Sequence, residues 1–256
     1  MKKPNYGFPI FHAFGLILIG TLVILFLCMI VLLFDVSYFG IIFLTLLIGT
    51  IYFTVIIIFR RHFFSKRISI LEKMIALAEL SGNENILDLG TGSGILAIGF
   101  AGHIENGGRV YGLDRFGVND INFLRQIIWM VKINYFGNNL RNALMNAEIK
   151  KVKDKCVFMS MDLTKGIKFP DCFFDIIISS QALSLISNQK QNNIFEEIDR
   201  VLKCGGRVIF FEPKKFRAHK WDILDTKGHF KKNKYDVKII PLQEFKSSCV
   251  FFGKKI

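Results

Sequence analysis

The sequence predicts an α/β fold, in which a doubly wound and largely parallel sheet follows a membrane-spanning helical hairpin. Strands alternate with helices from about residue 85 onward, the pattern of a parallel sheet covered by helices. A glycine-rich turn, ILDLGTGSG at Ile86–Gly94, directly follows the first of these strands. Two uncharged stretches of more than twenty residues precede the whole pattern and are long enough to cross a bilayer.

The glycine-rich turn predicts a nucleotide-like ligand. Apolar residues lead to Asp88, and glycines then occupy every second position at Gly90, Gly92 and Gly94, before a helical pattern begins. Glycines allow the backbone to approach a ligand closely at a helix N-terminus. A dinucleotide fingerprint requires a further glycine where this chain has Ile95. This difference, with the absence of a Tyr-x-x-x-Lys pair, argues against a nicotinamide-dependent dehydrogenase.

The expected secondary structure of the domain after the hairpin is read from hydrophobic periodicity and from glycine stops. Expected strands begin near Asn85 and continue at Arg109–Asp114, Cys156–Asp162, Phe174–Ser180 and Arg207–Pro213. Expected helices cover Ser65–Leu80, Asn139–Val152 and Gln189–Leu202. The C-terminal segments VKIIPLQEF and SSCVFFGKK, joined by a short turn, predict an antiparallel pair that closes the sheet.

Two transmembrane helices, at about residues 10–34 and 39–59, are expected to form an anchor over residues 1–64, followed by a second domain over 65–256. Their connecting loop carries only Asp35, whereas basic residues flank the pair on both sides. The positive-inside rule therefore places both termini and the catalytic domain in the cytoplasm, as expected for a two-pass integral membrane protein. A cleaved signal peptide is disfavoured because a second span follows the first at once.

The net charge of +13 suggests an anionic partner, either a membrane surface or a nucleic acid. Basic residues concentrate in Lys214–Lys220 and at Lys231, Lys232 and Lys234, but a solvated lysine-rich face is the favoured explanation of them. The chain has no separate RNA-binding module, which disfavours nucleic acid as a partner. Its five scattered cysteines and five histidines lack metal-ligand spacing and predict no metal site.

Three carboxylates, Asp88, Asp114 and Asp162, follow the apolar part of successive predicted strands. Ligands of open α/β sheets bind at this edge, outside the carboxyl ends of the strands. One such carboxylate can accept hydrogen bonds from ribose hydroxyls and another from an exocyclic amine. Each aspartate alone is explained as a capping residue, but the set beside the glycine turn favours a nucleoside ligand.

Residues 86–254 resemble the class I S-adenosylmethionine-dependent methyltransferases through ILDLGTGSG, VYGLD, MSMDL, FDIIISS and LKCGGRVIFFEP. The resemblance implies a Rossmann-like, seven-stranded methyltransferase sheet whose last strand is antiparallel. It also implies S-adenosyl-L-methionine as the cofactor, with the glycines under its methionine part, Asp114 on the ribose, Asp162 and the Leu163 backbone at adenine, and Ser179 at the methionine end. The full implied cofactor-binding set is Asp88, Gly90, Thr91, Gly92, Gly94, Asp114, Arg115, Asp162, Leu163 and Ser179. No catalytic residue is assigned.

A narrower resemblance is to bacterial methyltransferases that carry a two-helix membrane anchor before the same domain. Gly137-Asn138 and Asn146-Ala147 correspond to a Gly-Asn pair and an Asn-Ala helix in those proteins, whereas Ser184 stands near the place of their histidine. This chain also has an additional apolar stretch at about Phe116–Phe136, which is a candidate acceptor lid at the bilayer or a helix buried against the rest of the protein.

The predicted function is therefore that of a membrane-anchored methyltransferase. It moves a methyl group from S-adenosylmethionine to a small or lipid-like acceptor at the cytoplasmic membrane face, with the lipid bilayer as partner. Methyl transfer from a sulfonium is an in-line displacement, so the protein mainly orients and desolvates the reactants. Two alternatives stay open: a protein lysine methyltransferase acting on a membrane neighbour, and a non-catalytic cofactor-binding interaction protein. The intact glycine turn and the three aspartates argue against the second.

Overall fold

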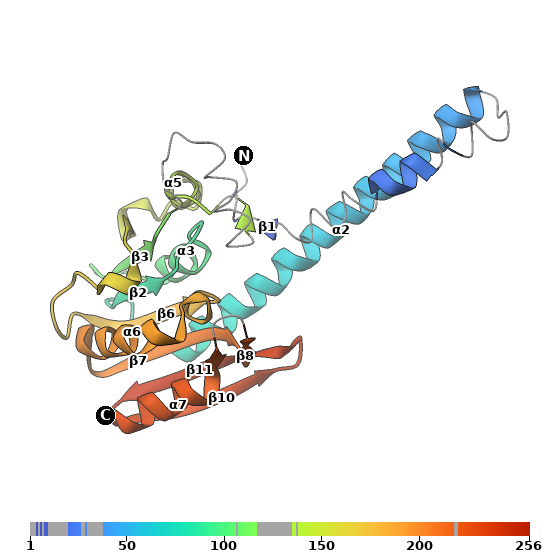
Figure 1. Cartoon of the computed structure of the whole chain (residues 1–256). Helices are drawn as coiled ribbons and strands as arrows, with labels where there is room; N and C mark the ends of the chain where they lie inside the picture. Colours follow the sequence, from blue (N-terminus) through green and yellow to red (C-terminus); the bar gives the residue numbers. More distant parts are fainter. Residues whose placement is uncertain are drawn as a thin grey trace. The chain divides into compact units, whose positions relative to one another are not determined.

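A computed structural model of the whole chain describes residues 4, 6, 8–9, 20–26, 29, 38–105, 107–116, 135–136, 138–217 and 220–256 (Figure 1). The chain divides into two compact units, and each is described by itself. The first unit comprises Met1–Tyr6, Ser69–Ile121 and Gly137–Ile256, and the second comprises Gly7–Ile68 and Asn122–Phe136. The predicted division into an anchor over residues 1–64 and a domain over 65–256 stays a prediction.

The first unit is built on a seven-stranded sheet with the order β10-β11-β7-β6-β2-β3-β5 (Figure 1). Its strands are β2 (Asn85–Leu89), β3 (Arg109–Asp114), β5 (Cys156–Ser160), β6 (Phe174–Ser180), β7 (Leu202–Pro213), β10 (Tyr235–Leu242) and β11 (Phe245–Lys255). Strands β2, β3, β5, β6 and β7 pair in parallel, whereas β11 is antiparallel to both β7 and β10. The predicted Rossmann-like, seven-stranded sheet with its last strand antiparallel is confirmed.

The central strands are buried on both faces, which explains their continuous apolar runs. On one face, sheet residues pack against α6 (Asn188–Val201) and α7 (Ile223–Lys232), which lie over the same side of the sheet in Figure 1. This core contains Leu87, Leu89, Ile177, Val208, Phe210 and Phe251 from the strands, with Ile194, Phe195, Ile198, Ile223 and Phe230 from the helices. Because side chains alternate along a strand, Ile86, Ile176, Ile178 and Ile209 are buried on the other face.

The remaining regular elements of this unit are short. They are α3 (Ile95–Ala101), α5 (Leu140–Ile149), the 3₁₀ turns η1 (Lys153–Lys155), η2 (Leu163–Lys165) and η3 (Leu183–Leu185), and the ladder of β8 (Lys215–Phe216) with β9 (Trp221–Asp222). The helix predicted over Asn139–Val152 is shorter than expected at both ends. Asn139 is its N-cap, and the Asn139 side chain accepts a hydrogen bond from the Asn142 N–H at 2.8 Å. Helix α7 was not predicted from the sequence.

The second unit contains the short ladder of β1 (Phe8–Pro9) with β4 (Tyr135–Phe136) and most of α2 (Tyr38–Ala78). The two helical segments predicted on either side of residues 60–64 are one helix of 41 residues, because no proline or glycine interrupts the sequence between them. Gly20 lies against the ring of Tyr52, where an added Cβ would come within 2.8 Å of the ring. Several apolar side chains of α2 are exposed, including Leu46 and Phe53 at 65% each.

The predicted localisation as a two-pass integral membrane protein with both termini in the cytoplasm is wrong. A helix needs about twenty consecutive apolar residues to cross the hydrocarbon core. Among the residues that the structure describes, no helix combines the length and the apolar character for such a crossing. Much of the first predicted span, at residues 10–19, 27–28 and 30–34, lies outside the described residues, as does the predicted lid between residues 117 and 134.

Candidate active site

The glycine turn lies between β2 and α3, at the edge of the sheet formed by the carboxyl ends of its parallel strands. Gly90, Gly92 and Gly94 all have left-handed backbones, with φ of 75°, 56° and 84°. Residues with a Cβ adopt this region only at a cost, which explains the glycine at every second position. The N–H groups of Gly90 and Thr91 donate to the Leu113 carbonyl at 2.8 and 3.0 Å, which ties the turn to the end of β3.

Asp88 supports the turn from inside the protein. Its side chain is 1% exposed, and Oδ2 accepts hydrogen bonds from the Thr91 hydroxyl at 2.7 Å and from the Ala97 N–H at 3.1 Å. The carboxylate therefore joins the turn to the first turn of α3. In this arrangement Asp88 and the Thr91 side chain shape the backbone of the turn rather than line its surface.

Asp114, at the end of β3, lies directly beside the glycine turn. Its two carboxylate oxygens accept hydrogen bonds from the Gly92 N–H at 2.8 Å and from the Phe116 N–H at 3.0 Å. Burial raises the pKa of Asp114, while backbone N–H groups of Gly92, Phe116 and Arg115 act in the opposite direction. A carboxylate can accept about four hydrogen bonds, so acceptor capacity remains for a ligand. Arg115 is exposed, and its carbonyl accepts a bond from the Ser160 hydroxyl at 3.3 Å.

Asp162 follows β5 at the same edge as Asp114, whose carbonyl accepts a hydrogen bond from the Met161 N–H at 2.8 Å. It is the N-cap of η2, which starts at Leu163, and its Oδ1 accepts from the Thr164 hydroxyl at 2.7 Å and the Thr164 N–H at 3.0 Å. The Thr164 hydroxyl lowers the pKa of Asp162, and the Thr164 N–H contributes in the same direction. The carboxylate is therefore held in its charged form next to the ends of β3 and β5.

Ser179 is completely buried near the end of β6. Its Oγ lies 3.0 Å from the Leu89 carbonyl and 3.3 Å from Oε1 of Glu212. The hydroxyl thus bonds within the protein, and it links β6 to β2 and β7. The structure brings the predicted residues on β2, β3, β5 and β6 to one edge of the sheet, whereas their direct contact with a cofactor stays a prediction.

Two buried polar atoms beside the glycine turn have no hydrogen-bond partner within the described part of the chain. They are the Ser93 hydroxyl oxygen and the side-chain oxygen Oδ1 of Asn138. The Asn138 amide lies over Gly92, where an added Cβ would be 3.0 Å from its Cγ. Buried polar atoms are rarely left unpaired in native proteins, so these atoms call for a ligand with hydrogen-bonding groups. S-adenosylmethionine carries hydroxyl, ammonium, carboxylate and amine groups, and the residues at this edge fit it.

Ser93, Asn138 and Glu212 lie at this edge but were not assigned to the site from the sequence. Glu212 is fully buried in β7 and lies near Ser179 and the loop after β6. Burial raises the pKa of Glu212, opposed by hydrogen bonds from the Ser184 hydroxyl and from the backbone of this loop. It follows an apolar run in RVIFFEP, so the signal that selected the other three carboxylates would also have selected this one.

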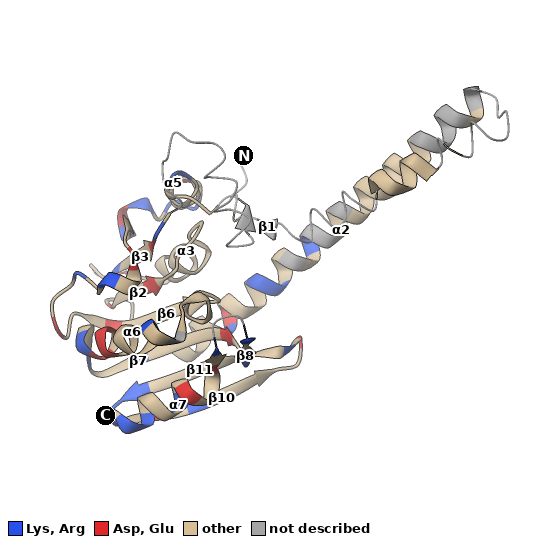
Figure 2. Ribbon diagram, in the orientation of Figure 1, with Lys and Arg blue, Asp and Glu red and all other residues tan. Residues whose placement is uncertain are grey.

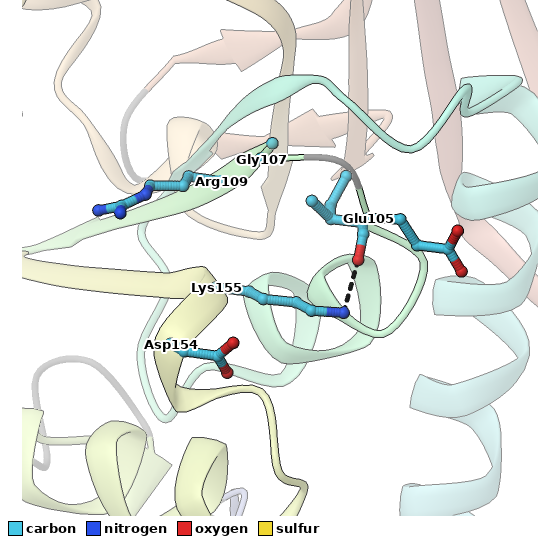
Figure 3. Close-up of a pocket in the computed structure, with 7 residues that line it drawn as sticks. Glu105, Gly107, Arg109, Asp154 and Lys155 are labelled. Carbon is cyan, nitrogen blue, oxygen red and sulfur yellow. Dashed lines mark hydrogen bonds between the residues drawn. The ribbon is translucent and has the colours of Figure 1, made fainter.

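A surface pocket lies at the opposite edge of the sheet, near the starts of β3 and β5 (Figure 3). Its lining includes Glu105, Arg109 and Asp154, and Lys155 Nζ donates to the Ile104 carbonyl at 2.6 Å. This position separates the pocket from the glycine turn. The ribbon of α7 and of the neighbouring strands carries several Lys and Arg positions, coloured blue in Figure 2, and Lys231, Lys232 and Lys234 are exposed to solvent.

The comparisons with known proteins agree with this geometry. Residues 117–210 match a protein family described as "Methyltransferase domain". The chain is 26% identical over 177 residues to the phosphoethanolamine N-methyltransferase of Plasmodium falciparum, an alignment that covers 68% of this chain and 54% of that protein. The chain therefore spans about half the length of the curated relative that it matches.

Similar folds occur among solved structures. A SAM-dependent methyltransferase from Aquifex aeolicus superposes with a TM-score of 0.55 at 15% identity, over 73% of this chain and 89% of that one. An N-methyltransferase from Bradyrhizobium japonicum, solved in complex with S-adenosyl-L-homocysteine, gives a TM-score of 0.52 at 13% identity, over 72% and 85% of the two chains.

The chain therefore has the class I methyltransferase fold, and these similarities support the predicted S-adenosylmethionine-dependent methyltransferase. Its cofactor is S-adenosyl-L-methionine, which supplies an electrophilic methyl group on a sulfonium sulfur.

Proposed function

We propose that the protein methylates the amine of a small, phosphate-bearing acceptor of the phosphoethanolamine type. The observation that carries this proposal is the similarity to a phosphoethanolamine N-methyltransferase over two thirds of this chain. The net charge of +13 attracts an anionic acceptor toward the protein.

For the cofactor we propose the set that the sequence indicates. The backbone of Gly90, Gly92 and Gly94 lies under the methionine part and Asp114 accepts bonds from the ribose hydroxyls. Asp162 and the Leu163 N–H contact adenine. Asp88, Thr91, Arg115 and Ser179 complete the set, the buried ones by shaping the backbone that the cofactor contacts. The position of Asp114 beside Gly92 supports this assignment, because its carboxylate keeps free acceptor capacity next to the turn.

The protein contributes position and desolvation to the reaction. An in-line displacement requires the acceptor nitrogen, the methyl carbon and the sulfur to be collinear, and holding them so removes much of the entropic barrier. The acceptor nitrogen must be unprotonated, because its lone pair forms the new bond to carbon. We assign no general base, since an amine that loses its proton before binding needs none.

Transfer of a labelled methyl group from S-adenosylmethionine tests the proposal. We expect labelled product with phosphoethanolamine and at least about tenfold less with ethanolamine, which lacks the phosphate charge. A lysine-containing peptide is the third acceptor. Transfer to the peptide alone would replace the proposal with the lysine methyltransferase alternative. A protein that binds S-adenosylhomocysteine but labels none of the three acceptors would contradict the small-amine proposal.

A further inference from the structure

Glu212 is a fully buried carboxylate that accepts hydrogen bonds from neutral groups of the protein. Oε1 accepts from the N–H groups of Ala182 and Leu183, each at 3.0 Å, and Oε2 accepts from the Ser184 N–H at 3.3 Å. Within the described part of the chain, Glu212 forms no ion pair with a lysine or arginine. A buried carboxylate is costly unless its oxygens are hydrogen-bonded, so these donors and Glu212 depend on one another.

These donors belong to the loop that follows β6, which we define as residues 181–185. The Gln181 N–H donates to the Phe211 carbonyl at 2.8 Å, directly beside Glu212 in β7. Gln181 has a left-handed backbone with φ of 56°, a conformation that a residue with a Cβ adopts at a cost. Four successive N–H groups of the 181–185 loop are thus directed at two neighbouring residues of β7, which hold the loop in a strained path.

The 181–185 loop in turn contacts the glycine turn. A Cβ built on Gly90 would be only 2.2 Å from the Ala182 Cβ, so Ala182 fills the space beside Gly90 that a side chain would occupy. The Ala182 N–H also donates one of the hydrogen bonds that Glu212 accepts. A continuous chain of contacts therefore leads from Glu212 through Ala182 to the first glycine of the turn.

We propose that Glu212 is a positioning residue for methyl transfer, which holds the 181–185 loop against Gly90 and so sets the shape of the cofactor-binding turn. This role rests on the methyltransferase activity and is independent of which acceptor the protein uses. Glu212 acts through the loop and through Ala182, without touching the cofactor itself.

Glu84 offers a matched control at the opposite edge of the sheet. It is also buried, at 4% exposure, and its two carboxylate oxygens accept the N–H groups of Ser81 at 2.5 Å and Gly82 at 2.9 Å. It precedes β2, whereas the glycine turn follows β2. Both carboxylates thus organise a loop through backbone N–H groups, but only Glu212 lies at the cofactor edge.

The test compares Glu212→Gln with Glu84→Gln in the full chain. In Glu212→Gln, one oxygen becomes an N–H donor that cannot accept the loop's bonds. We expect amide hydrogen exchange at residues 182–184 to accelerate about tenfold or more, and the Kd for S-adenosylhomocysteine, measured by calorimetry, to rise about tenfold. In Glu84→Gln we expect faster exchange only near residues 81–82 and an unchanged Kd.

If Glu212 is merely structural, Glu212→Gln will lower the melting temperature, as Glu84→Gln does, and will leave the Kd for S-adenosylhomocysteine at the wild-type value. That result would overturn the proposal. Unchanged exchange at residues 182–184 would overturn it as well. Ala182→Gly is the second variant, since it removes the methyl group beside Gly90 and leaves every bond to Glu212 in place. It should weaken S-adenosylhomocysteine binding with little change in exchange, and wild-type binding would contradict the link through Ala182.

Discussion

At the scale of single residues, the glycine turn depends on two separate properties of glycine, its backbone freedom and its small size. Gly90 has both a left-handed backbone and a neighbour, Ala182, in the space of a side chain. Gly107 has a comparable φ of 87° but no atom within 4 Å of an added Cβ. The two glycines therefore allow the cost of the backbone conformation to be separated from the cost of a steric clash.

We predict that Gly107→Ala lowers the free energy of unfolding by about 1–2 kcal/mol, the cost of a left-handed alanine. Gly90→Ala should lower it by about 1–3 kcal/mol more, because the new methyl group also displaces Ala182. Denaturant unfolding of both variants measures the difference. Binding of S-adenosylhomocysteine should be lost in Gly90→Ala and retained in Gly107→Ala; equal effects of the two substitutions would contradict the close contact at Gly90.

Asp114 supports a second prediction at this scale. Asp114→Asn keeps the size of the side chain but removes its charge and half of its acceptor capacity, so we expect the Kd for S-adenosylhomocysteine to rise about tenfold to a hundredfold. Asp154→Asn is the control, because Asp154 is exposed at the opposite edge of the sheet. Calorimetry on the two variants decides, and wild-type affinity in Asp114→Asn would remove Asp114 from the proposed site.

At the scale of elements, α6 is joined to the segment before β6 by Arg200. Its guanidinium donates to Glu197 through Nε at 2.8 Å and through a terminal nitrogen at 2.9 Å, and also to Asp171 at 2.6 Å. The remaining contacts are to the carbonyls of Ile167 and Phe169 at 2.8 and 2.9 Å. Bidentate pairing of this kind has a defined geometry, and here it fixes the loop that enters β6 against the helix.

This cluster predicts a pH dependence of stability. The hydrogen bond from Arg200 lowers the pKa of Glu197 from 4.5 to about 2, and the Ile167 N–H contributes in the same direction. Because the folded-state pKa is the lower one, the contribution is complete above pH 4.5 and is lost as the pH falls toward 2. Glu197→Gln should therefore lower the unfolding free energy at pH 7 and flatten its decline between pH 4.5 and 2. Glu148→Gln, at an exposed side chain, should keep the wild-type profile.

At the scale of the whole molecule, the sheet of the first unit is completed by a strand that runs against the others. β11 lies between β7 and β10 and pairs antiparallel with both. Its residue Phe251 is fully buried, faces Phe210 in the register and stacks on it with ring centroids 5.8 Å apart and planes 10° apart. Phe230 of α7 packs at 5.4 Å from the same ring, so β11 joins sheet and helix in one core.

We predict that Phe251→Ala lowers the free energy of unfolding by about 3–5 kcal/mol, the usual cost of removing a fully buried aromatic ring. Leu224→Ala, at a side chain that is 60% exposed on α7, should change it by no more than about 0.5 kcal/mol. Denaturant titration of both variants checks the difference. A small effect of Phe251→Ala would mean that β11 contributes little to the stability of the sheet.

The sequence by itself predicted the sheet correctly and predicted candidate site residues that lie at its ligand edge. Apolar runs such as Phe174–Ser180 indicate buried strands, because strands that are buried on both faces are continuously apolar. A carboxylate that directly follows such a run is expected at the ligand edge, because the carboxyl ends of parallel strands lie there. The local apolar pattern of the first sixty residues led to a wrong prediction of membrane localisation, which the described helices contradict. The same pattern also predicted a break at residues 60–64, where α2 is continuous. The helix continues there because no proline or glycine lies between its two predicted parts.

Only the tertiary structure decided which groups meet at the site. Glu212 receives its hydrogen bonds from residues about thirty positions earlier, and Asn138 lies over Gly92 across more than forty residues of chain. Such contacts depend on how strands are ordered in the sheet and on the paths of the loops between them, which no local pattern records. The glycines, strands and aspartates can therefore be predicted from the sequence. The contact of the 181–185 loop with Gly90 forms only once the sheet has formed.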